Sequence, residues 1–140
     1  MTEIPNCFYR ISVKALVLNE TRDKFLLCES ENGWWDLPGG GLDFGMTPQE
    51  DLPREITEEM GVPVTKIAEY PSYFVTEKRH SRDEWKACVA YETELAHLDF
   101  TPSNECVSVR FVDKHDIENM NLFVCVKKLA EMFRPENHAL

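Results

Sequence analysis

A glycine triplet followed by an acidic helical segment most constrains what this chain can fold into. Residues 39–62 read GGGLDFGMTPQEDLPREITEEMGV. Apolar residues spaced i, i+4 and i+8 predict a helix face that packs on a core. They are Leu52, Ile56 and Met60. At about 100° per residue, the acids of the REITEE run fall within roughly one quadrant of the same helix. They are Glu55, Glu58 and Glu59.

This clustering of acids on one helix face is electrostatically unfavourable. Like charges spaced i, i+3 and i, i+4 repel, and carboxylates near a helix C-terminus oppose the helix macrodipole. A divalent cation would relieve both penalties. The alternative is an ordinary solvated acidic face, although Glu59 lies beside the apolar stripe and should be only partly solvated.

The ends of the helix carry their own signals. The run Thr47 to Glu50 is a capping box with proline at the first helical position, so the helix should begin near Pro48. Pro53 removes one backbone hydrogen bond inside the helix. Either the helix kinks there, or Asp51 acts as a second cap. Gly61 predicts the helix end.

The whole segment resembles the Nudix box, the signature of the Nudix hydrolases. That signature reads G, five residues, E, seven residues, then R-E-U-x-E-E-x-G-U, where U is a bulky aliphatic residue. The first glutamate is replaced here by Met46, whose thioether is a poor ligand for Mg²⁺. The WWDLPGGG run of residues 34–41 also looks like the usual lead-in. All other specified positions agree: Gly40, Arg54, Glu55, Ile56, Glu58, Glu59, Gly61 and Val62.

The resemblance implies a divalent metal site where water attacks phosphorus. Carboxylates suit Mg²⁺ or Mn²⁺, and such ions polarise a phosphoryl oxygen and lower the pKa of a bound water. Among the implied catalytic residues, Arg54 orients the carboxylates. Glu105, in the loop before the last strand, serves as metal ligand or general base, or alternatively is a solvated loop residue. The implied metal ligands are Glu55, Glu58, Glu59 and the backbone carbonyl around Gly40.

Gly39, Gly41 and Asn121 are predicted substrate contacts. The glycines let the backbone approach a phosphate or a metal, although a plain tight turn is the alternative. Asn121 would read a base edge, as an asparagine there does in the nucleotide-sanitising branch of the family, or would simply cap the last helix.

Cationic and aromatic side chains supply further substrate contacts. Many relatives carry a phosphate-gripping arginine at the end of the second strand, which here reads Cys28-Glu29-Ser30. Either a basic loop or the first strand must then supply the cation, although the alternative for the loop is an ordinary solvated surface. The candidates are Lys78, Arg79 and Arg82 in the loop, and Arg10 and Lys14 on the strand. The candidate stacking surfaces for a base are Trp34, Phe74 and Trp85.

The rest of the chain alternates strands and helices. Alternating apolar and β-branched residues predict strands over 8–18, 25–29, 85–95 and 107–112, and residues 73–75 are also strand-like. A polar turn makes the first two strands a hairpin. Residues 77–84 form an exposed loop, and an amphipathic helix covers 121–133, with Leu122, Val126, Leu129 and Phe133 facing inward. We expect one domain over residues 1–140 of the α/β (α+β) class. The resemblance implies the same, a Nudix-type α/β/α sandwich with a mixed β-sheet.

Composition limits the partners. A formal net charge of −10 argues against a nucleic-acid polymer or an anionic membrane as the main partner. The first ten residues lack the pattern of a signal peptide and no apolar run is long enough to span a membrane, so a cytoplasmic location is expected. The cysteines are odd in number and widely spaced, which disfavours zinc and disulfides. Those set among apolar residues should be core residues, namely Cys28, Cys88 and Cys125.

Two functional hypotheses follow. The first is a hydrolase that uses Mg²⁺ or Mn²⁺ to cleave a phosphoanhydride in a small-molecule nucleoside diphosphate derivative, such as a nucleotide, a nucleotide sugar or an ADP-ribose-like compound. The second, motivated by Met46 and the missing strand arginine, is a catalytically attenuated Nudix-like domain that binds a nucleotide or a protein partner. Family members are often dimers, so a homodimer is possible.

Overall fold

The computed structural model describes residues 7–79 and 83–140. The helices and strands of these residues follow one another in this order: β1 (Tyr9–Leu16), β2 (Phe25–Glu29), β3 (Trp35–Asp36), β4 (Gly39–Gly41), α1 (Pro48–Met60), β5 (Val64–Ile67), β6 (Tyr73–Lys78), β7 (Trp85–Leu95), β8 (Ser108–Val112), α2 (Val124–Met132) and the 3-10 helix η1 (Pro135–Asn137).

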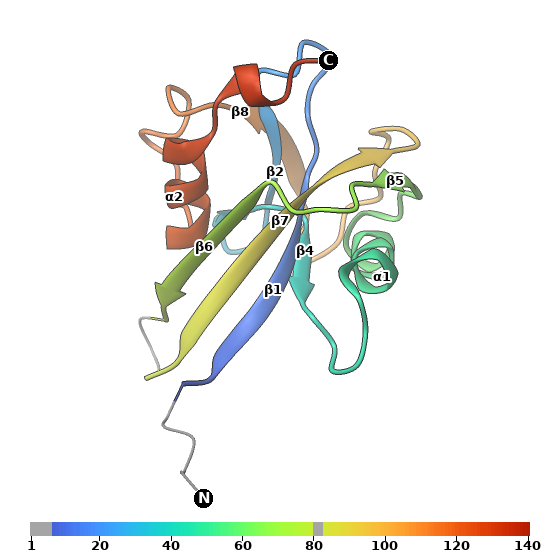
Figure 1. The fold of residues 1–140 in the computed structure, drawn as a ribbon. Coiled ribbons are helices and arrows are strands. Elements are labelled where there is room, and N and C mark those ends of the chain that lie inside the picture. Colours follow the sequence, from blue (N-terminus) through green and yellow to red (C-terminus); the bar gives the residue numbers. More distant parts are fainter. Residues whose placement is uncertain (1–6, 80–82) are drawn as a thin grey trace, which may run out of the picture.

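The larger sheet is mixed and has the strand order β4-β1-β7-β5, with β6 also paired to β7 (Figure 1). Strand β1 runs parallel to β7, and the other pairs are antiparallel. Strand β7 is 11 residues long, so one edge of it pairs with β6 along its first part and with β5 along its last part. The glycine strand β4 therefore lies at one edge of this sheet.

The predicted hairpin between the first two strands forms only at the turn, because β1 and β2 belong to different sheets. An isolated antiparallel bridge joins Leu18 and Phe25 across the turn. Strand β1 then pairs with β4 on one edge and β7 on the other, so neither edge is left for β2. Strand β2 instead forms a second sheet with the order β3-β2-β8.

The two α-helices cover opposite sides of the sheets (Figure 1), which confirms the predicted α/β/α sandwich. On one side, Ile56 of α1 packs in a core with Val13 and Ala15 of β1. On the other side, Val126 of α2 packs in a core with Leu16 at the end of β1. The free cysteines Cys28, Cys88 and Cys125 belong to these cores, which confirms their predicted core role, and Cys106 is buried there as well.

Helix α1 begins where the capping box predicts. The Thr47 hydroxyl accepts a hydrogen bond from the Glu50 N–H, and the Glu50 side chain accepts one from the Thr47 N–H. The helix continues through Pro53 and ends at Gly61, whose φ of 66° lies in the left-handed region. Asp51 is therefore not a second cap. Its side chain is fully buried and accepts hydrogen bonds from the Asp43 N–H and the Arg54 guanidinium.

Helix α2 begins later than predicted, and Asn121 does not cap it. The N-cap is Phe123, which makes no side-chain cap hydrogen bond. The orphan N–H of Cys125 instead donates to Glu77 Oε2 at 2.9 Å. Residues 77 and 78 belong to β6 and Glu77 is buried, so the predicted exposed loop begins only after Lys78. A carboxylate far away in sequence thus replaces the local cap.

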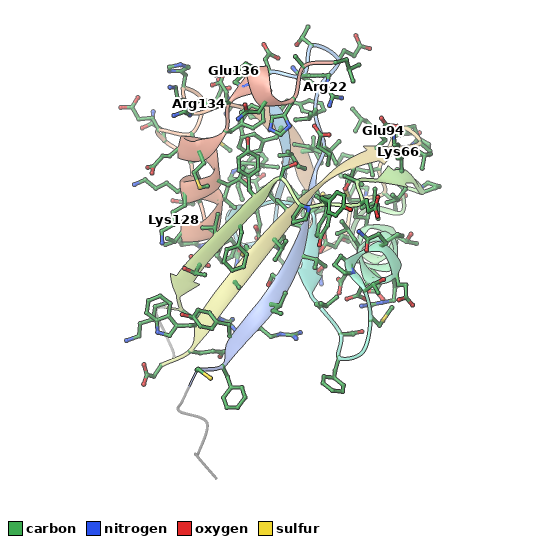
Figure 2. The ribbon with its side chains drawn as sticks, viewed as in Figure 1. Arg22, Lys66, Glu94, Lys128, Arg134 and Glu136 are labelled. Atoms are coloured by element: carbon green, nitrogen blue, oxygen red, sulfur yellow. The ribbon has the colours of Figure 1, made fainter. Side chains whose placement is uncertain are left out.

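The C-terminal segment contacts the larger sheet through the side chain of His138. His138 is buried, with Nδ1 at 2.8 Å from Glu92 Oε1 and Nε2 at 2.7 Å from the Tyr73 hydroxyl. Arg22 donates to the same Glu92 oxygen, and Figure 2 places Arg22 at the end of the molecule where Arg134 also lies. In the described part of the chain, no helix is long and apolar enough to cross a membrane.

Candidate active site

A cavity of about 390 Å³ is lined by the glycine strand β4, the acidic helix α1 and the loop before β8. Its acidic lining residues are Asp36, Glu55, Glu59 and Glu105. The others are Cys28, Ser30, Asn32, Trp34, Leu37, Gly39, Gly40, Gly41 and Phe123. The structure thus brings together the predicted glycines, two of the three predicted helix acids and the predicted loop acid.

The glycine triplet is a strand and not the tight turn that was the alternative. It pairs antiparallel with residues 12–14 of β1. Gly39 has a φ of 132°, and a Cβ there would lie 2.1 Å from the Val13 carbonyl oxygen, so only glycine fits. A Cβ on Gly40 would lie 2.8 Å from Glu55 Oε2. The missing side chain lets the Glu55 carboxylate lie directly against the backbone.

Glu59 is a buried acid on the helix side of this cavity. Its side chain follows the apolar stripe of α1, and the residue is only 6% exposed. The Gly39 N–H donates to Glu59 Oε2 at 3.3 Å. Burial, together with the charges of Glu105 and Glu55, raises the pKa of Glu59 to about 8, although Lys14 and the Gly39 N–H act in the opposite direction. At neutral pH this carboxyl group keeps its proton unless a cation takes the proton's place.

Glu55 lies nearer the rim of the same cavity. Burial raises its pKa above the usual range, and the charges of Asp51 and Glu58 add to this effect. Arg54 works against it, because Nη2 of Arg54 donates to Glu55 Oε1 at 3.0 Å. The cavity therefore concentrates negative charge that its own residues only partly offset.

Lys14 is a buried cation behind the cavity. Its ammonium lies 3.0 Å from Asp36 Oδ2, and the residue is 5% exposed. Burial would lower its pKa, but the charges of Asp36 and Glu59 together raise it above the ordinary value. Lys14 therefore stays charged, yet its ammonium is engaged with Asp36. It was one of the cations considered for phosphate binding, and it does not line the cavity.

Arg54 holds four carboxylates at once. It donates to Asp51 Oδ1 through Nε at 3.0 Å, to Glu58 Oε1 at 2.8 Å, and to Asp43 Oδ2 and Glu55 Oε1 at 3.0 Å each. Asp51 also accepts a hydrogen bond from the Asp43 N–H. Although burial disfavours its charged form, these hydrogen bonds hold the pKa of Asp51 below its usual range. The fully buried Asp51 carboxylate thus fixes the position of the Arg54 guanidinium.

Two motif positions lie outside the cavity lining. The Glu58 side chain is 60% exposed and is held at the rim by Arg54. Met46 is half-buried, and its N–H donates to the Asp43 carbonyl at 3.1 Å. Because Asp43 and Asp51 already hold Arg54, the position of this guanidinium does not depend on a carboxylate at residue 46.

The predicted basic loop does not reach this cavity. Lys78 pairs with Asp83 at 3.4 Å and Arg79 pairs with Glu84 at 3.7 Å, and neither residue lines the cavity. Trp85 packs on Tyr9 and is in register with it, five residues along β1 from Lys14. At roughly 3.3 Å per residue, that separation is about 16 Å. Phe74 is exposed on β6 and does not line the cavity either, and Arg82 lies outside the described residues.

Arg10 is the cation that β1 brings to the glycine strand. Its guanidinium donates to the Leu42 carbonyl at 2.9 Å. It also lies over Gly41, where a Cβ would come within 2.1 Å of Nη2. Of the five basic candidates, Arg10 is thus in direct contact with a residue of the cavity wall.

An aromatic pair forms another wall. The ring centroids of Trp34 and Phe123 lie 5.4 Å apart with an interplanar angle of 39°. Trp34 was a predicted stacking residue, whereas Phe123, Asp36 and Asp51 were missed. Asp36 directly precedes the Leu-Pro-Gly run and could have been noted as an extra acid. The sequence holds no comparable signal for Phe123, because only tertiary folding brings the start of α2 to this cavity.

The donor set of the cavity suits a hard divalent cation. Within residues 7–79 and 83–140, no three His, Cys, Asp or Glu side chains already lie in a metal-holding arrangement. The carboxylates of Glu55, Glu59 and Glu105 nevertheless face one cavity beside Gly40, and oxygen atoms are the ligands that Mg²⁺ and Mn²⁺ prefer. The pKa of Glu59 is raised chiefly by burial and further by the charges of Glu105 and Glu55, and a bound cation would offset these effects.

The fold and the cavity define a class of protein, the α/β/α sandwich in which a glycine strand faces an acidic helix. A model of the NUDIX domain matches residues 8–132. The chain therefore belongs to the Nudix domain family. The family in general uses divalent metal ions.

Curated relatives share parts of the chain. A putative 8-oxo-dGTP diphosphatase 3 of Mycobacterium tuberculosis is 30% identical over 100 residues, which cover 69% of this chain and 45% of that protein. An RNA pyrophosphohydrolase of Nitratiruptor is 38% identical over 71 residues, 46% of each chain. A MutT-like protein of Streptomyces ambofaciens is 36% identical over 56 residues, 40% of this chain and 36% of that one. The matched segments thus span about half of these relatives or less.

Solved structures resemble the whole described fold. The MutT protein of Methanosarcina mazei Go1 superposes with a TM-score of 0.70 at 28% identity, covering 94% of this chain and 96% of that chain. A UDP-X diphosphatase superposes with a TM-score of 0.72 at 20% identity, covering 92% and 62%. The second likeness concerns the fold alone.

Proposed function

We propose that this chain hydrolyses a phosphoanhydride bond in a nucleoside diphosphate derivative, with Mg²⁺ or Mn²⁺ held in the carboxylate cavity. The observation that carries the proposal is the convergence of Glu55, Glu59 and Glu105 beside the Gly40 backbone in one cavity. The names of relatives support it, since they include pyrophosphohydrolases and diphosphatases.

Each residue has a role in this proposal. Glu55, Glu59 and the carbonyl around Gly40 would hold the metal, and Glu58 would join them from the rim. When bound, the metal supplies polarisation of a phosphoryl oxygen and acidification of a water. Arg54 is a positioning residue, because its hydrogen bonds fix Glu55 and Glu58.

Water attacks phosphorus directly, so no covalent enzyme intermediate forms. The new bond joins the water oxygen to phosphorus, and the bond from phosphorus to the bridging oxygen breaks. Glu105 takes the proton of the attacking water, and the leaving phosphate carries away the bond's electrons. The backbone of Gly39 and Gly41 and the Arg10 guanidinium would orient the substrate, whereas Asn121, also a predicted substrate contact, does not line this cavity.

The test is a hydrolysis assay on dNTPs, ADP-ribose, nucleotide sugars and dinucleoside polyphosphates, with Mg²⁺ and with EDTA. Glu59→Gln should lower kcat/KM by at least about a hundredfold, because the metal contributes several kcal/mol to the transition state. Glu94→Gln is the matched control, since Glu94 lies at the far end of β7 beside Lys66 (Figure 2). The proposal fails if no compound is hydrolysed in a metal-dependent way that Glu59→Gln abolishes.

The catalytically attenuated binding domain is the competing hypothesis. It would give ligand affinity by calorimetry without turnover, and Met46→Glu would then raise activity strongly. The positions of Met46 and Arg54 do not favour it, because Asp43 and Asp51 already hold the guanidinium. We expect Met46→Glu to change activity by less than about threefold.

A further inference from the structure

Two buried thiols lie beside the carboxylate cavity, and the proposed hydrolysis uses neither of them. Cys28 is near the end of β2 and lines the cavity. Cys106 lies in the loop before β8, directly after Glu105, and is fully buried. Both side chains belong to the core on the α1 side of the sheets. One thiol thus forms part of the cavity wall, and the other adjoins a residue of that wall.

These two thiols are in contact. The Cys28 thiol donates a hydrogen bond to the Cys106 sulfur. The Cys106 S–H in turn donates to the Ser108 carbonyl, with 3.8 Å between sulfur and oxygen. The backbone brings the pair together, because β2 runs antiparallel to β8 and the Val107 N–H donates to the Glu29 carbonyl at 2.7 Å. Two sulfurs that already touch need little movement to form a disulfide.

Cys106 also closes the turn that carries Glu105. Ser103 and Cys106 form an antiparallel bridge with backbone hydrogen bonds of 3.0 and 3.1 Å. Asn104 and Glu105 are the residues between them. The Ser103 hydroxyl donates to the Glu59 carbonyl at 2.6 Å, so the turn is anchored on α1 as well. The position of Glu105 in the cavity therefore depends on the position of Cys106.

A second pair of thiols shows what is particular to the first. Cys88 of β7 and Cys125 of α2 are also buried and share a hydrogen bond. Neither of them lines the carboxylate cavity, whose volume of about 390 Å³ admits a molecule as small as hydrogen peroxide. Such an oxidant meets Cys28 when it enters the cavity. Access, and not the contact between sulfurs alone, distinguishes the first pair.

We propose that Cys28 and Cys106 form an oxidative modification site, at which hydrogen peroxide produces a disulfide that weakens metal binding in the carboxylate cavity. In the first step the Cys28 sulfur attacks one peroxide oxygen, the O–O bond breaks, and the other oxygen leaves as water with the thiol proton. In the second step the Cys106 sulfur attacks the sulfur of this sulfenic acid, and a second water leaves with the Cys106 proton as the S–S bond forms. The two sulfurs are oxidised, and the peroxide is reduced to two waters.

The disulfide acts on the cavity through the turn. A covalent S–S bond holds two sulfurs closer together than a hydrogen bond does, so it draws Cys106 toward β2. Because Ser103 stays anchored on α1, the turn must change shape, and Glu105 moves relative to Glu59. This effect on metal binding rests on the proposed function, whereas formation of the disulfide does not. A thiol reductant breaks the S–S bond by exchange and restores the turn.

The first test treats the reduced protein with hydrogen peroxide and maps its cysteines by peptide mass spectrometry. The wild type should form a disulfide between Cys28 and Cys106, and dithiothreitol should reverse it. Cys88→Ala is the matched control, because it removes a thiol of the other buried pair and should leave this disulfide in place. The proposal is overturned if no disulfide forms, if Cys88 and Cys125 are linked instead, or if Cys28 is oxidised only to sulfinic acid.

The second test measures Mn²⁺ affinity before and after oxidation, with peroxide and reductant removed before each titration. The oxidised wild type should bind Mn²⁺ about tenfold more weakly, and dithiothreitol should restore the affinity. In Cys28→Ala, peroxide treatment should leave the affinity unchanged. A disulfide that forms without a change in Mn²⁺ affinity would overturn its coupling to the cavity. Absence of Mn²⁺ binding in the reduced wild type would instead contradict the proposed function, and the cysteine map distinguishes that result from failure of the modification site.

Discussion

The carboxylate cavity and the turn between β6 and β7 both gather charged residues, but they hold them in different ways. In the cavity, two of the acids accept hydrogen bonds from distant parts of the chain: Asp36 from the Lys14 ammonium, and Glu59 from the Gly39 N–H. At the turn, Lys78 pairs with Asp83, a close neighbour in sequence, at the surface. Exposed pairs of this kind contribute little, because water and salt screen them. Burial with long-range partners, and not the number of charges, distinguishes the candidate site.

After Glu59→Gln, the next largest effect on the candidate site should come from Arg54→Ala. The guanidinium fixes Glu55 and Glu58 and is itself held by Asp51. Loss of a group that orients metal ligands typically costs about 10- to 100-fold in activity or metal affinity. We expect kcat/KM to fall by that factor and the Mg²⁺ concentration for half-maximal activity to rise. A purely structural role would leave that Mg²⁺ requirement unchanged and would contradict the assignment.

The smallest effect should come from the surface turn. Lys78→Gln combined with Arg79→Gln removes two cations that do not line the carboxylate cavity. We expect kcat/KM and the melting temperature to stay close to the wild-type values, within about twofold and about 2 °C. A tenfold rise in KM would show that the turn reaches the substrate after all, and the contrast between the two regions would be lost.

Local features of the site could be predicted from the sequence because neighbouring residues determine them. Helix α1 follows from the capping box and the i, i+4 stripe, and the same spacing places Glu55 and Glu59 on the cavity side. Glu58 lies on the same helical wheel, but its pairing with Arg54 keeps it at the rim. The motif thus located the cavity but not the position of each acid in it.

The remaining features depend on contacts between distant segments. The parallel pairing of β1 with β7 joins residues more than 70 positions apart, and no local pattern specifies it. That pairing places Trp85 beside Tyr9 and away from the cavity. The antiparallel pairing of β1 with β4 brings Arg10 against Gly41. In the same way, Glu77 of β6 caps α2, which explains why a helix without a local cap begins at Val124.

The most direct test of the central claim is titration with Mn²⁺, with the free ion followed by electron paramagnetic resonance. The wild type should bind Mn²⁺ at least about tenfold more tightly than Glu59→Gln, because the variant lacks a buried anionic ligand. The Lys78→Gln and Arg79→Gln double variant should match the wild type. Equal Mn²⁺ affinity in the wild type and Glu59→Gln would contradict the assignment of this cavity as the metal site.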